Sequence, residues 1–278
     1  MKLLTVLGAG PGDVISLVGG GGKTSLGLAL VAEAVVAGLR AVFAVTTKIY
    51  PVPLPTVVGL DLAAVRRFSA CCVVAGPAPG GKLAGLPPTE IGHLLEAANF
   101  VAVEADGSAG RPLKFPLAHE PVIPPASTFV LPVAGAGVVG KPLTDEWVHR
   151  AAQAAAYLGV PEGGGVTAAM VARLLWGPAA QGRPKAARVV PVINQVDNYP
   201  AAARAIGAEL LALGARQVLL TAARAPGPVL EVMTARRRAG DPSPLPFSSP
   251  GLPFPSHGLH SPLSHCGMHK APDDNRGR

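Results

Sequence analysis

The chain has little charge and few aromatic side chains, and both deficits limit what it can bind. Only 15% of its 278 residues are charged and 4% are aromatic, and the net charge is +7. A nucleic-acid-binding surface typically shows clustered Lys and Arg, and bases stack on aromatic rings, but no long basic cluster occurs in residues 1–235. The composition therefore favours a small anionic ligand and predicts no nucleic-acid partner.

Cysteines and long apolar runs are also scarce. Three cysteines, two of them adjacent at Cys71 and Cys72, provide neither a disulfide framework nor the spacing of a four-ligand zinc site. The longest apolar stretch, residues 26–45, is interrupted by Glu33 and Arg40, so it is a poor candidate for a bilayer span. The N-terminal apolar run lacks the pattern of a cleavable leader. We therefore expect a cytoplasmic protein without membrane contact.

Glycine and proline are abundant instead, with 34 and 30 copies, and their distribution divides the chain. Up to about residue 232, short apolar runs alternate with Ala-rich amphipathic segments, a pattern typical of βα units. From residue 239 onward Pro, Ser, Gly and His dominate, and such a segment buries too little apolar area to offset its ordering entropy. We predict an α/β domain over residues 1–238 and a disordered tail over residues 239–278.

The expected strands and helices alternate along the domain. Short apolar or β-branched runs predict strands at residues 14–18, 41–45, 71–74, 100–103, 129–133, 189–193 and 217–220. Amphipathic segments predict helices at residues 25–38, 90–98, 145–158, 166–176 and 200–213. This alternation predicts a mostly parallel sheet.

The segment VISLVGGGGKTSLGLAL is an apolar strand that runs into a glycine loop and then directly into a helix, which is the context of a phosphate-binding loop. Lys23 would neutralise the β- and γ-phosphates, and the Thr24 hydroxyl would ligate Mg²⁺. The loop is G-x-x-G-K-T, shorter than the usual motif, and resembles that of Mur-type amide ligases. The predicted nucleotide contacts are Gly19, Gly20, Gly21, Gly22, Lys23, Thr24 and Ser25.

Four successive glycines would cost chain entropy with no gain in packing, so we interpret them as evidence of close approach between the backbone and a ligand. The alternative is a glycine-rich turn beside an exposed lysine. With the loop in place, the expected fold is a P-loop NTPase-like three-layer sandwich with a mostly parallel sheet.

Two acids follow the strand at residues 100–103. Because side chains alternate along a strand, Glu104 and Asp106 share a face, where they could hold Mg²⁺ together with Thr24. The alternative is a solvated strand end with two unrelated acids. Arg111 and Lys114, on the next loop, are donors suited to a phosphate or an anionic substrate, or else plain surface charge.

Two further strands also end in polar residues, and ligands of open α/β sheets bind outside such ends. Thr47 and Lys48 follow the strand at residues 41–45. Asn194 and Asp197 follow a later strand with the spacing of the Asn-Lys-x-Asp motif of guanine-binding proteins, although Gln195 replaces the lysine. The alternative is a merely polar strand end, so both ATP and GTP stay open as ligands.

Five segments in order, ISLVGGGGKTS, VTTKIYP, VEADGSAGRPLKFPLAHEPVIP, GKPLTDEWVHR and INQVD, resemble the YqeC family, described as accessory proteins of selenium-dependent hydroxylases. The resemblance covers about residues 14–224, and the long middle segment is its specific part. It implies a P-loop nucleotide-binding protein that takes part in the maturation of selenium-dependent molybdenum hydroxylases. The implied partners are such a hydroxylase or its cofactor-loading proteins.

The resemblance also implies a set of site residues. They are Gly22, Lys23, Thr24, Thr47, Lys48, Glu104, Asp106, Gly107, Ser108, Arg111, Pro112, Lys114, His119, Glu120, Pro121, His149 and Arg150. The chain departs from the family at Gln195, where a lysine is often found, and the tail has no recognised counterpart.

Together these features predict an accessory protein that binds ATP or GTP with Mg²⁺ and hydrolyses it. The expected catalytic residues are Lys23, Glu104, Asp106 and Arg111. Two alternatives stay open: an ATP-dependent ligase or small-molecule kinase, and a non-catalytic GTP-dependent switch that docks on a partner enzyme.

Overall fold

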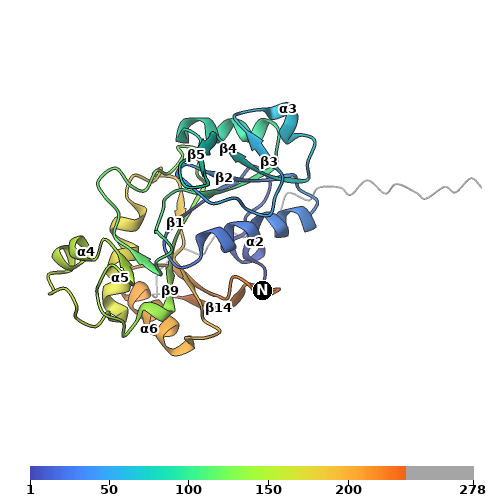
Figure 1. Ribbon diagram of the computed structural model, residues 1–278. Coiled ribbons are helices and arrows are strands. Elements are labelled where there is room, and N and C mark those ends of the chain that lie inside the picture. Colours follow the sequence, from blue (N-terminus) through green and yellow to red (C-terminus); the bar gives the residue numbers. More distant parts are fainter. Residues whose placement is uncertain (236–278) are drawn as a thin grey trace, which may run out of the picture. The chain divides into compact units, whose positions relative to one another are not determined.

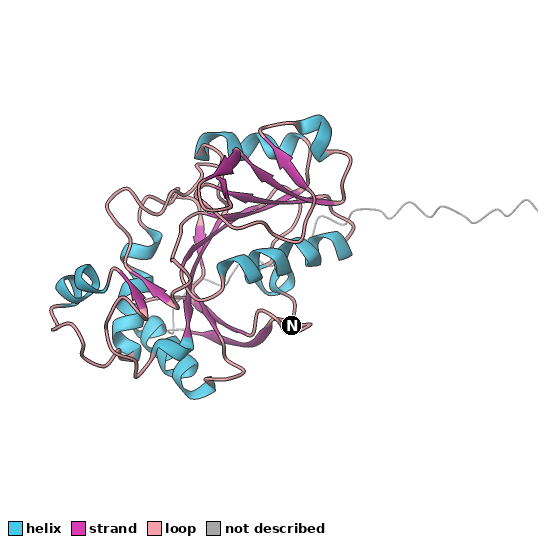
Figure 2. Cartoon of the chain, viewed as in Figure 1, coloured by secondary structure: helices cyan, strands magenta, loops and turns pink. Residues whose placement is uncertain are grey.

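The computed structural model describes residues 1–235, which fold around one central sheet (Figures 1 and 2). The segment 239–278, predicted to be disordered, lies outside the described residues. Within residues 1–235, ten strands form this sheet in the order β14-β13-β12-β9-β1-β7-β2-β4-β3, with β11 also paired to β9. Every pair is parallel except β13 with β14, so the predicted α/β class with a mostly parallel sheet is confirmed.

The strands of the sheet are β1 (Val14–Gly19), β2 (Ala41–Val45), β3 (Thr56–Val58), β4 (Ala70–Val74), β7 (Phe100–Glu104), β9 (Phe129–Gly135), β11 (Arg188–Val189), β12 (Val192–Asn194), β13 (Gln217–Thr221) and β14 (Val229–Thr234). Two small pairs lie outside it: an antiparallel hairpin of β5 (Gly76–Ala78) and β6 (Lys82–Ala84), and a parallel pair of β8 (Leu113–Lys114) and β10 (Val148–His149).

Helices cover both faces of the sheet. The α-helices are α1 (Leu3–Leu7), α2 (Lys23–Val36), α3 (Leu62–Val65), α4 (Ala151–Leu158), α5 (Ala168–Trp176) and α6 (Pro200–Ala212), and the 3₁₀ helices are η1 (Pro88–Glu96), η2 (Ala136–Val138) and η3 (Pro178–Ala180). None of the helices within residues 1–235 is long and apolar enough to cross a membrane.

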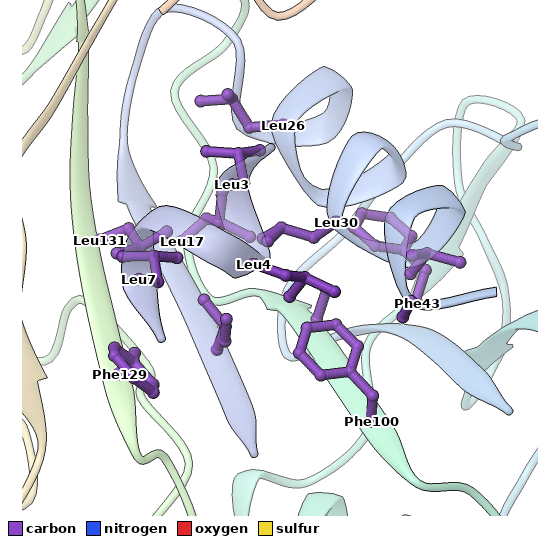
Figure 3. Close-up of a cluster of buried hydrophobic side chains, with 14 of the residues drawn as sticks. Leu3, Leu4, Leu7, Leu17, Leu26, Leu30, Phe43, Phe100, Phe129 and Leu131 are labelled. Atoms are coloured by element: carbon purple, nitrogen blue, oxygen red, sulfur yellow. The ribbon is translucent and has the colours of Figure 1, made fainter. Parts of the chain in front are cut away.

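Alternation of side chains along β1 sends its apolar residues into two different cores. Leu17 packs with α1 and α2 on one face, and Figure 3 shows Leu26 and Leu30 of α2 in this cluster with Phe43 and Phe100. Val14 and Val18, from the same strand, pack with η1 and α3 on the opposite face. A third cluster joins α4, α5 and α6 to β12 and β13. Helices, sheet and helices therefore form three layers.

All the predicted strands and helices are present, with changes at several boundaries. The strand predicted at residues 189–193 is divided into β11 and β12 around Pro191, which has no N–H to donate. The helix predicted from residue 145 begins at Ala151, because the residues before it pair as β10 with β8. The predicted helix at residues 90–98 is the 3₁₀ helix η1. The short α1 and the edge strands β3 and β14 were missed.

Strand order decides where a ligand can bind. Strand β1 is central, with β7 and β2 on one side and β9, β12 and β13 on the other. The carboxyl ends of parallel strands lie at one edge of the sheet, so the loops after β1, β2, β7, β12 and β13 gather there. These are the loops that carry the predicted site residues.

Candidate functional site

The turn from β1 to α2 presents free backbone donors. Four consecutive N–H groups, from Gly22 to Ser25, have no acceptor among the described residues. They stand at the first turn of α2, where unpaired N–H groups and the helix dipole create partial positive charge. Such a terminus favours an anionic group as its partner.

The preceding glycines serve the fold itself. A Cβ on Gly19 would overlap the carbonyl of Val133 in β9, and one on Gly21 would overlap the backbone of Gly135. The N–H of Gly20 donates to Val133 O at 2.8 Å, and that of Gly21 donates to Arg111 O at 3.0 Å. The interpretation that these glycines bring no gain in packing is therefore wrong, and the free donors begin only at Gly22.

Lys23 is buried against the two predicted acids, with only 3% of its surface exposed. Its Nζ donates to Gly19 O at 2.6 Å and lies 3.2 Å from Asp106 Oδ1 and 3.7 Å from Glu104 Oε1. Both oxygens of Asp106 accept from the N–H of Gly19, at 3.1 and 3.0 Å. The end of β7 and the lysine that follows the glycine loop thus form one charged cluster.

Thr24 and Glu104 form the part of the site best suited to a metal. Thr24 Oγ1 donates to Glu104 Oε2 at 2.6 Å. Burial raises the pKa of Glu104, and the Lys23 ammonium and the Thr24 hydroxyl oppose that shift without cancelling it. No three His, Cys, Asp or Glu side chains within residues 1–235 cluster as a metal site. A hydroxyl and one or two carboxylates fit Mg²⁺, which takes its remaining ligands from substrate phosphates and water.

Lys114 is a buried partner of the acids and does not lie on the surface of the site. Its fully buried Nζ is 3.2 Å from Asp106 Oδ2 and 2.9 Å from Glu120 Oε2. The guanidinium of Arg150 donates two hydrogen bonds to the carboxylate of Glu120, at 2.6 and 3.1 Å. Burial would raise the pKa of Glu120, but the hydrogen bonds from Arg150 and the Lys114 ammonium outweigh it and hold that pKa at about 2.

This row, Lys23, Glu104, Asp106, Lys114, Glu120 and Arg150, is called the buried ion row below. Lys114 lines neither cavity found within the described residues, so contact between Lys114 and a phosphate stays a prediction. His119 is exposed, and burial lowers the pKa of His149.

Two cavities meet at the glycine loop (residues 19–22) and share Gly21, Gly22, Ser25 and Gly110. The first, of about 540 Å³, extends toward β12 and β13; its other lining residues are Pro112, Gly137, Trp147, Asn194, Gln195, Asp197, Asn198, Tyr199, Ala222, Ala223 and Arg224. The second, of about 690 Å³, extends toward the end of β2; it adds Lys23, Thr24, Lys48, Ile49, Tyr50, Pro51, Val52, Lys82, Glu104, Gly107, Ser108, Ala109 and Arg111.

The predicted residues divide between these cavities. Lys48 and Arg111 line the second, although the Arg111 guanidinium already donates to Asp145 O at 2.7 Å and to Ala109 O at 2.8 Å. Asn194 and Asp197 line the first. Thr47 is half-buried and lines neither.

Several lining residues were missed by the sequence reasoning. Lys82 reaches the second cavity because a bridge between Ile49 and Leu83 docks the β5–β6 hairpin there, and its Nζ lies 5.0 Å from the centre of the Tyr50 ring. Tyr50 belongs to the VTTKIYP segment and could have been included from its place in that motif. The segment around Lys82 carries no comparable signal.

The buried Asn194 connects three loops of the site. Its Nδ2 donates to Gly21 O at 2.8 Å, while its Oδ1 accepts from the N–H of Ala223 at 3.0 Å and from Thr221 Oγ1 at 3.2 Å. The glycine loop is thereby fixed to the ends of β12 and β13.

Comparison with known proteins identifies relatives of the part of the chain that contains these residues. A family model described as YqeC protein matches residues 15–152. "Uncharacterized protein YqeC" of Escherichia coli (strain K12) is 38% identical over an alignment of 157 positions that covers 53% of this chain. Residues 15–152 of the chain belong to the YqeC family. The match spans 61% of the length of that YqeC relative, and no solved structure matches the chain. The YqeC match contains the glycine loop and the whole buried ion row, whereas the first cavity also uses residues beyond it.

Proposed function

We propose that the protein binds a nucleoside triphosphate with Mg²⁺ and hydrolyses it, as an accessory factor in the maturation of selenium-dependent molybdenum hydroxylases. The nucleotide part rests on one observation: four unpaired N–H groups, a lysine and a threonine–carboxylate pair converge where two cavities meet. The accessory part rests on the resemblance of the sequence to the YqeC family.

In this proposal each residue has a defined task. The N–H groups from Gly22 to Ser25 bind phosphate oxygens, and Lys23 turns from Gly19 O to the β- and γ-phosphates. Thr24 and Glu104 would hold Mg²⁺, which would neutralise the charge that develops on those phosphates. Asp106 stays fixed by Gly19 and Lys114 and keeps the lysine oriented.

With Glu104 committed to the metal, the other carboxylate at the end of β7 would orient the attacking water. Asp106 Oδ1 becomes available for this when Lys23 turns to the phosphates. Arg111, on the wall of the second cavity, would supply a cation for the negative charge that develops on the γ-phosphoryl group and on the departing nucleoside diphosphate.

A second candidate function is transfer of the phosphoryl group to a small anion, or ATP-dependent ligation of that anion. The observation that favours it is the second cavity, which carries three cations, Lys48, Lys82 and Arg111, beside the phosphate loop. Its volume of about 690 Å³ leaves room for a co-substrate.

The test is nucleotide binding measured as a rise in melting temperature, because a ligand that binds only the folded state must stabilise it. We expect ATP or GTP with Mg²⁺ to stabilise the wild type and to leave Lys23→Ala unchanged. The exposed Lys185→Ala is the matched control and should behave as the wild type. A wild-type response of Lys23→Ala would refute the proposal.

Product analysis then separates the two candidates. Release of phosphate without any co-substrate supports hydrolysis, whereas turnover that requires an added small anion, with a phosphorylated or coupled product, supports transfer.

A further inference from the structure

The first cavity has a recognition surface at its far end, where β12 and β13 terminate. We propose that this surface binds a guanine base and that the carboxylate of Asp197 reads it. The inference rests on the proposed function, since it concerns the base of the nucleotide whose phosphates lie at α2.

The position of the cavity fits a nucleoside attached to those phosphates. Gly22 and Ser25 line it at one end, and the loops after β12 and β13 line it at the other. In the sheet, β9 separates β1 from β12, and β13 follows β12, so the cavity leads across the sheet edge away from the second cavity. A volume of about 540 Å³ lies within the range of small-ligand sites.

The walls of this cavity are held in place before any ligand enters. The three hydrogen bonds of Asn194 fix the phosphate loop against Thr221 and Ala223. Gln195 adopts a left-handed conformation, with φ of 69°, and its carbonyl accepts from the N–H groups of Asn198 at 3.2 Å and Tyr199 at 3.0 Å. Non-glycine residues in this conformation persist where the surroundings impose it, often at ligand sites. The turn that carries Asp197 is therefore preorganised.

Asp197 differs from Asn194 in having no internal partner. Its side chain is exposed on the cavity wall, and no described residue donates a hydrogen bond to it or forms an ion pair with it. A carboxylate is an acceptor only, with two oxygens side by side. The complementary group is a pair of adjacent N–H donors.

Guanine presents that pair and adenine does not. The N1–H and the 2-amino group of guanine point in the same direction and can each donate to one oxygen of Asp197. Adenine places the lone pair of N1 beside its amino group, so one carboxylate oxygen would face an acceptor. Arg224 on the same wall is a donor available to the O6 acceptor of guanine.

Aromatic side chains complete the surface. Trp147 and Tyr199 both line the cavity, and Tyr199 leaves 45% of its area exposed. Rings of this kind provide stacking faces for any base, so they add affinity while Asp197 adds discrimination.

The test compares the dissociation constants of GTP, ATP and XTP, measured by calorimetry with Mg²⁺ for the wild type, Asp197→Asn and Asp197→Ala. We expect the wild type to bind GTP at least about tenfold more tightly than ATP, the scale of a two-bond base contact. Asp197→Asn should bind GTP about tenfold more weakly and XTP more tightly than the wild type does. The reason is that xanthine carries a carbonyl in place of the 2-amino group, and the Asn amide can donate to it. Asp197→Ala should lose affinity for GTP without gaining affinity for XTP. The exposed Glu162→Gln should bind all three nucleotides as the wild type does.

Equal affinity of the wild type for GTP and ATP, tighter binding of ATP, or unchanged GTP affinity in Asp197→Asn would each overturn the inference. If nucleotides bind in a Lys23-dependent manner without preference for guanine, only this inference fails. If no nucleotide binds, the proposed function fails with it. An unchanged melting temperature of Asp197→Asn without nucleotide verifies that the variant is folded.

Discussion

Charged side chains on the two sides of the glycine loop differ in whether they have partners within the protein. On the β7 side, every charged group of the buried ion row has a partner within the chain. On the β12 side, the carboxylate of Asp197 has no partner among the described residues, although the neighbouring Asn194 makes three hydrogen bonds. The paired groups of the buried ion row contribute to the stability of the fold. An unpaired group such as Asp197 affects stability little and is available to a ligand. Substitutions on the two sides should therefore separate stability from binding.

The largest effect is expected from Lys114→Met, which keeps the apolar stem and removes the charge. It leaves Asp106 and Glu120 without the ammonium between them, and removing one partner of a buried ion pair lowers the free energy of unfolding by about 3–5 kcal/mol. Urea denaturation should show a loss of this size. The exposed Lys185→Met should change the free energy of unfolding by less than about 0.5 kcal/mol. A stability of Lys114→Met close to that of the wild type would break the comparison.

A smaller, pH-dependent effect is expected from Glu120→Gln. The pKa of Glu120 is lowered to about 2 in the folded protein, so ionised Glu120 stabilises the fold at pH values above its unfolded-state pKa of about 4.3. This contribution is lost as the pH falls toward 2. The variant should be less stable than the wild type by about 1.5–3 kcal/mol at pH 7. Denaturation curves from pH 6 to pH 2.5 should show the two proteins converging. A difference that stays constant with pH would exclude Glu120 as its source.

The smallest effect on stability is expected from Thr24→Val, at the boundary between the two sides. The change removes one hydrogen bond to Glu104 and should cost about 1 kcal/mol. It should also abolish the gain in nucleotide affinity that Mg²⁺ gives the wild type, because the metal loses its hydroxyl ligand. Titration with Mg²⁺ and with a chelator measures this, and nucleotide affinity in the chelator should equal that of the wild type. Retained Mg²⁺ dependence would remove Thr24 from the metal site.

The sequence was informative where chemistry follows local order. The central strands were predicted from apolar runs, and Lys23, Glu104 and Asp106 were predicted from residues at the ends of two of those strands, which the parallel sheet brings together. The burial of Lys114 could not be seen, because it depends on the pairing of β8 with β10, segments more than 30 residues apart. The place of Lys82 depends in the same way on the contact of a distant hairpin.

The glycine loop shows a different limit of sequence reasoning. Its composition suggested a ligand, but the close neighbours of Gly19 and Gly21 belong to β9, a strand more than 100 residues further along the chain. A requirement for glycine reveals that something lies near the backbone. Only the structure identifies what it is.

The folded position of Lys23 sets a threshold for any anion that uses it. The ammonium is satisfied by Gly19 O and two carboxylates, so a ligand gains from it only by offering more negative charge than those groups already provide. A lone phosphate or a short carboxylate gives little advantage over that internal arrangement, whereas a polyphosphate chain with its metal does. The apparent affinity of weak competitors is reduced by the fraction of molecules in which the lysine is released. In the proposed function, this loop would therefore favour polyphosphates over anions of lower charge.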